Sequence, residues 1–65
     1  MYTTKSTLAD MRYVLSNLSE QFIEELDRGN FTREDVRRTI KSFIAHRRSL
    51  TLWNDDAIMG MLGYQ

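Results

Sequence analysis

Apolar residues in the first half of the chain recur at the spacing of an amphipathic helix. They stand three and four positions apart, at Leu8, Met11, Leu15, Leu18 and Phe22. A spacing of this kind places the side chains along one seam of a helix. Thr7 precedes the seam, and Asp10 follows three residues later, which is a weaker form of the capping box. The pattern therefore predicts a first helix over about residues 7–28.

The segment over residues 29–32 predicts a turn between two helices. Gly29 can end the first helix in the left-handed conformation that favours glycine. Thr32 can cap the next helix, because its hydroxyl can accept a hydrogen bond from the amide of Asp35. We therefore expect a second helix over about residues 33–50, with Ile40 and Phe43 on its apolar face. So short a connection makes the two helices antiparallel neighbours.

A short third helix is expected over about residues 55–62. Asn54 can cap it, and Gly63 can end it. Gly60 weakens it by about 1 kcal/mol relative to alanine. The predicted fold is thus a single all-α domain over residues 1–65, an antiparallel helical hairpin with a short C-terminal helix.

The length of the chain predicts self-association. With 65 residues and no cysteine, the chain has a small core and no disulfide. Small helical chains often complete their core by pairing. We expect a dimeric helical bundle whose interface contains Leu8, Met11, Leu15, Leu18, Phe22, Ile40 and Phe43. No apolar run approaches the roughly 20 residues of a membrane span, and the absence of cysteine favours a reducing compartment, so a cytoplasmic protein is predicted.

Charge is balanced overall but unevenly placed. Nine basic and nine acidic residues give no net charge, yet residues 33–48 contain six bases and two acids. The basic residues that could contact phosphates of a nucleic acid are Arg37, Arg38, Lys41, Arg47 and Arg48. The alternative explanation is that the bases near the turn, Arg33 and Arg37, pair with acids of the first helix such as Glu24.

No constellation of residues predicts catalysis or metal binding. His46 is the only histidine, and without cysteine it has no partners for the three protein ligands that a zinc site needs. Glu20 and Glu24 lie four residues apart, but they point away from the apolar seam. The glycines are scattered and form no phosphate-binding loop. We therefore expect no enzyme activity, no metal and no cofactor.

The C-terminal segment is dense in aromatic residues and methionine. Its members are Trp53, Met59, Met61, Leu62 and Tyr64. Such residues are common on adaptable binding surfaces, so they could anchor another protein. They could equally complete the core of the monomer or of the dimer.

Two resemblances bear on function. Residues 29–40 resemble the turn and recognition helix of the helix-turn-helix motif. The first helix is too long for the compact version, Glu25 stands where that motif has a small residue, and Val36 and Ile40 are one position out of register. No base-reading role is therefore assigned to this segment.

In size and layout, the chain also resembles the small accessory proteins that tailed phages encode in their early regions. Many of these bind host proteins, so the resemblance implies a host regulatory or replication protein as partner, in the host cytoplasm. The predicted function is that of a small non-enzymatic regulator that acts by protein–protein interaction. The alternative is a small nucleic-acid-binding regulator that uses the basic face of the second helix.

Overall fold

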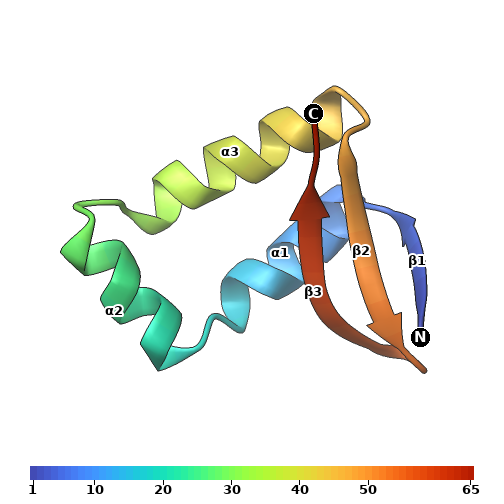
Figure 1. Ribbon diagram of the computed structural model, residues 1–65, viewed down its shortest axis with the longest axis horizontal. Coiled ribbons are helices and arrows are strands. Elements are labelled where there is room, and N and C mark those ends of the chain that lie inside the picture. Colours follow the sequence, from blue (N-terminus) through green and yellow to red (C-terminus); the bar gives the residue numbers. More distant parts are fainter.

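The chain folds into three helices and a three-stranded sheet. In a computed structural model of all 65 residues, the elements are β1 (Tyr2–Lys5), α1 (Leu8–Ser16), α2 (Glu20–Arg28), α3 (Arg33–Ala45), β2 (Ser49–Asn54) and β3 (Ala57–Gly63). The strands are antiparallel in the order β1-β2-β3, and α2 lies at the end of the molecule farthest from the sheet (Figure 1). The fold is therefore α+β, and the predicted all-α helical hairpin, with the dimeric helical bundle built on it, is wrong.

The predicted first helix is two helices. The capping box at its start is confirmed, because the Thr7 hydroxyl accepts from the Asp10 amide while the Asp10 carboxylate accepts from the Thr7 amide. The helix then stops at Ser16, with Asn17 as its C-cap. Ser19 begins α2, since its hydroxyl accepts from the amide of Phe22 at 3.1 Å. The apolar seam therefore breaks where polar residues offer the backbone new partners.

The predicted turn between helices is confirmed in place and corrected in detail. Helix α2 ends at Arg28, and Thr32 caps α3 through a capping box with Asp35. The left-handed residue, however, is Asn30 with φ 58°, whereas Gly29 has φ −86°. Asparagine is one of the few residues that tolerates this region without strain.

The second half of the predicted fold differs most. Helix α3 ends at Ala45, five residues before the predicted boundary, and the expected third helix is instead part of a β-hairpin. In this hairpin Leu50 faces Leu62, and Asn54 faces Ala57. Asp55 in the connecting turn has φ 55°. The asparagine and aspartates that suggested a helix cap therefore form a hairpin turn, a role that the same residue types also serve.

The core lies between α1 and the sheet, and it is small. Met11 and Leu15 are its only buried hydrophobic residues. Beside them a chain of hydroxyls is buried: Ser49 donates to Ser6 at 2.8 Å, Ser6 lies 2.8 Å from Thr51, and Thr51 donates to the Asp10 carboxylate at 2.9 Å. These bonds link the N-terminus of α1 to the middle of β2. Leu50 and Leu52 alternate along β2 with the buried Ser49 and Thr51, so they belong to the opposite face of the sheet. That face carries no helix (Figure 1).

The molecule exposes more surface than a compact protein of its mass. Its accessible surface is 5085 Å², whereas a compact monomer of 7.7 kDa exposes about 4,300 Å². Its radius of gyration is 11.8 Å, against about 10.7 Å for a compact domain of this length. The excess surface indicates that apolar faces of the helices remain uncovered.

Candidate functional site

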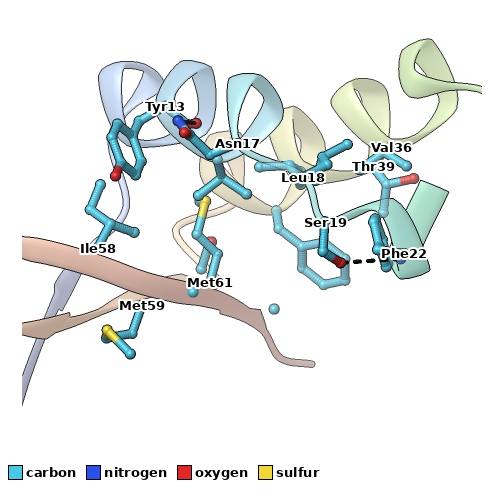
Figure 2. Close-up of a pocket in the computed structure, with 16 residues that line it drawn as sticks. Tyr13, Asn17, Leu18, Ser19, Phe22, Val36, Thr39, Ile58, Met59 and Met61 are labelled. Atoms are coloured by element: carbon cyan, nitrogen blue, oxygen red, sulfur yellow. Dashed lines mark hydrogen bonds between the residues drawn. The ribbon is translucent and has the colours of Figure 1, made fainter.

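One uncovered region is an apolar groove between the helices and β3. Its volume is about 600 Å³, and 10 of its 16 lining residues are hydrophobic. Figure 2 shows Tyr13 of α1 and Asn17, its C-cap, on one side, Ile58 and Met61 of β3 below them, and Leu18, Phe22 and Val36 at the far end. We call this cavity the groove. Its shape and lining suit an apolar partner surface rather than a polar small molecule.

The apolar face of α3 lies between the groove and a second opening. Val36, Ile40 and Phe43 line the groove and also line the opening towards α2, to which Leu26 and Phe31 contribute. None of the residues of α3 is buried. A helix whose apolar face borders solvent on both sides lacks the packing that normally stabilises it.

Helix α2 is even less covered. It contains no buried residue, and Phe22 and Ile23 expose 38% and 41% of their surface. Its polar face is acidic, since Glu20, Glu24, Glu25 and Asp27 outnumber the single base Arg28. The helix therefore presents an apolar ridge flanked by negative charge.

The structure divides the predicted oligomer interface between two places. Met11 and Leu15 are buried in the core and are not available to another chain, and Leu8 lies outside the groove. The remaining members line the groove together: Leu18, Phe22, Ile40 and Phe43.

Ten of the 16 groove residues lay outside every predicted site, among them Tyr13 and Val36. Val36 precedes Ile40 by four residues, so helical spacing alone could have identified it. Tyr13 borders the groove because β3 lies opposite α1, and the sequence pattern did not predict that strand.

The C-terminal aromatic and methionine residues do not form one surface. Trp53 stacks on Tyr2 with ring centroids 6.1 Å apart, and its indole donates to Thr4 at 2.8 Å. Met59 and Met61 both line the groove, although their side chains extend from opposite sides of β3 (Figure 2). Leu62 of β3 and Tyr64, which follows β3, are exposed. The Tyr64 hydroxyl donates to the carbonyl of Arg47.

Ion pairs account for part of the basic stripe. Arg37 donates to the Glu34 carboxylate at 2.7 and 2.9 Å, and this bond lowers the pKa of Glu34. Arg38 lies 4.0 Å from both Glu34 and Asp35. The pKa of Asp35 is lowered because the Thr32 amide and hydroxyl donate to its carboxylate.

No ion pair joins α2 to α3, so the expected pairing of Arg33 and Arg37 with acids of the first helix is wrong. Arg33 instead donates to the carbonyl of Leu15 at the end of α1, where a cation favours the helix dipole. Each of the four salt bridges joins residues of the same helix, one of them in α2 and three in α3. Lys41, Arg47 and Arg48 take part in none of them. The acids of α2 and the free bases of α3 and its C-terminal end therefore remain available for contacts outside the chain.

The titratable groups are otherwise dispersed. The ring of His46 hydrogen bonds to the carbonyl of Ser42 at 2.8 Å, and no three histidine or carboxylate side chains converge in a way that could hold a metal ion. None of the three helices is both long enough and apolar enough to cross a membrane.

Comparison of the chain with protein-family models, with curated proteins and with solved structures finds no significant match. The residues of the chain itself are therefore the basis for its proposed function.

Proposed function

We propose that this chain is a non-enzymatic binding protein that acts through contact with another protein chain in the groove. The observation that supports the proposal most directly is the apolar face of α3, which borders open space on both sides. Contiguous exposed apolar surface on a small chain marks an interaction site, because leaving it in water forgoes about 25 cal/mol for each Å².

The lining of the groove also favours a protein as the occupant. Aromatic and methionine side chains from three helices and one strand surround it, and such side chains adapt to the irregular surface of a partner. Few polar groups converge inside it, so it offers little that would orient a polar metabolite.

Site-specific photo-crosslinking in the cells that produce the protein tests this proposal. A benzophenone side chain placed at Thr39, an exposed residue at the groove, is expected to form a covalent adduct with a protein chain. The matched control is the same group at Thr3, which is exposed on the outer face of the sheet beside Leu52. Adducts at Thr3 alone, or at neither position, would contradict the proposal. An adduct with a host protein at Thr39 would support the role suggested by the phage accessory proteins.

A nucleic-acid-binding function is the second candidate, supported by the sequence α2, turn, α3 and by the unpaired Lys41. Carboxylates oppose it, because Glu34 and Asp35 lie in the first turn of α3. Fluorescence anisotropy with a labelled DNA duplex across a salt series tests it. Binding would have to weaken steeply with salt, and Lys41→Ala would have to reduce the slope by about one phosphate contact.

A further inference from the structure

We infer that the protein chain that occupies the groove is a second copy of this same chain. This inference rests on the proposed function and names its partner. The first support is the area involved. The excess of accessible surface over that of a compact monomer is about 750 Å². A standard protein–protein interface buries about 800 Å² on each partner, so one copy covering another would remove an amount close to the whole excess.

The second support is that the chain carries both halves of a contact. Helix α2 exposes an apolar ridge with Ile23, which lies outside the groove, and Phe22, which lies at the far end of its own groove, while the face of α3 in that groove carries Val36 and Ile40. In a two-fold pair the same two surfaces meet twice, once in each direction. The ridge of each copy then covers the open face of the other.

The third support is charge. Helix α2 carries four acids and one base, and Lys41 and the residues that follow α3 carry positive charge with no ion-pair partner in the chain. When α2 of one copy lies along α3 of the other, opposite charges meet at both symmetric contacts. Exposed pairs add little affinity, but they fix the orientation and exclude the arrangement in which like helices face each other.

Sedimentation equilibrium across a concentration series tests the inference with two matched variants. The wild-type chain is expected to have the mass of a dimer. Thr39→Glu, a change at an exposed helical position, places two carboxylates in the covered groove and should raise the dissociation constant about 100-fold or more. Thr3→Glu introduces the same charge on the outer face of the sheet and should leave the constant within about threefold.

Charge reversal tests the orientation without disturbing the apolar surface. Glu25→Lys and Lys41→Glu both change exposed residues, and each should weaken the dimer of its own variant about tenfold because two contacts become repulsive. An equimolar mixture of the two variants should recover the wild-type affinity, because both contacts of the mixed dimer then join opposite charges. Only a contact between copies can be rescued by mixing.

The outcomes separate the inference from the proposed function. A chain that stays monomeric, while Thr39 crosslinks to a different protein, overturns the second copy as partner and leaves the proposed function standing. A dimer that Thr3→Glu dissociates and Thr39→Glu does not overturns the inference, because the pair would then form through the outer face of the sheet. A monomer with no crosslink at Thr39 overturns both. If the equimolar mixture associates no more tightly than either variant alone, the arrangement of α2 along α3 is overturned.

Discussion

Replacing Thr51 by valine should measure how strongly the buried hydroxyl chain holds α1 on the sheet. Thr51 has no exposed surface, and its hydroxyl donates to the Asp10 carboxylate at 2.9 Å. Valine keeps the branched shape of threonine, so the change removes the hydroxyl with little change in volume. The Asp10 carboxylate, which is also buried, then loses one of its donors and keeps the amide of Thr7.

The expected cost follows from the two bonds that the Thr51 hydroxyl makes. A hydrogen bond to a charged group contributes about 1.5–3 kcal/mol to the free energy of unfolding. The loss at Ser6 is smaller, because Ser6 still accepts from Ser49 at 2.8 Å. We therefore expect Thr51→Val to lower the free energy of unfolding by about 2–3 kcal/mol. For a domain of this size that corresponds to a fall of about 10–20 °C in Tm.

Urea denaturation followed by Trp53 fluorescence and by circular dichroism measures this loss. All proteins must be compared at one concentration, because association adds stability that depends on concentration. Thr3→Val is the matched control, since Thr3 is an exposed strand residue and its free energy of unfolding should change by less than about 0.5 kcal/mol. If Thr51→Val proved as stable as Thr3→Val, the hydroxyl chain would not hold α1 in place, and the account of the core given above would be refuted.

Two further predictions test β3 and the start of α3. A Cβ atom at Gly63 would come within 3.0 Å of the Phe43 ring, whereas one at Gly60 would meet nothing within 4 Å. Gly63→Ala should therefore lower the free energy of unfolding by about 1–3 kcal/mol, while Gly60→Ala should leave it unchanged or raise it, as urea titrations would show. The lowered pKa of Asp35 means that its carboxylate stabilises the folded chain above pH about 4 and that this contribution is lost as the pH falls through the lowered value. Asp35→Asn should therefore be less stable than wild type at pH 7, and the difference should shrink towards pH 2–3 in urea titrations at each pH.

The sequence predicted those parts of the fold that depend on neighbours within one helical turn. Thr7 with Asp10 and Thr32 with Asp35 are capping pairs three residues apart, and both form as expected. The break at Ser19 is also local, since its hydroxyl caps α2. It was missed because the apolar spacing continued through it. The prediction thus followed the spacing of the apolar residues and overlooked Ser19 as an N-cap, although both are local signals of helix structure.

The sheet could not be predicted in the same way, because its partners are far apart along the chain. Tyr2 pairs with Trp53. The register between β1 and β2 is therefore fixed only when residues from opposite ends of the chain meet. Residues 49–52 do alternate between polar and apolar, which is the period of a strand. The methionines and leucine of β3, however, favour helices by intrinsic propensity, and tertiary pairing overrides that preference.

The candidate site was predicted in part for the same reason. Leu18, Phe22, Ile40 and Phe43 gather at the groove because helical spacing correctly places each on the apolar face of its own helix. The seam residue Leu15 has a different role, since it is buried in the core of its own chain. Sequence periodicity identifies which side chains avoid water, but only the fold decides which of them remain for a partner.

The stability of α2 connects the small core with the open groove. An isolated helix of fewer than about 12–15 residues is marginal in water, and α2 has 9 residues, none of them buried. The sheet covers one face of α1 and offers nothing to α2, whose connections end at the turns around Ser19 and Asn30. The packing that keeps α2 helical must therefore come largely from whatever covers Phe22 and Ile23. On the proposed function, ordering of α2 and occupation of the groove would belong to one equilibrium, and association would supply stability that the small core of the chain does not.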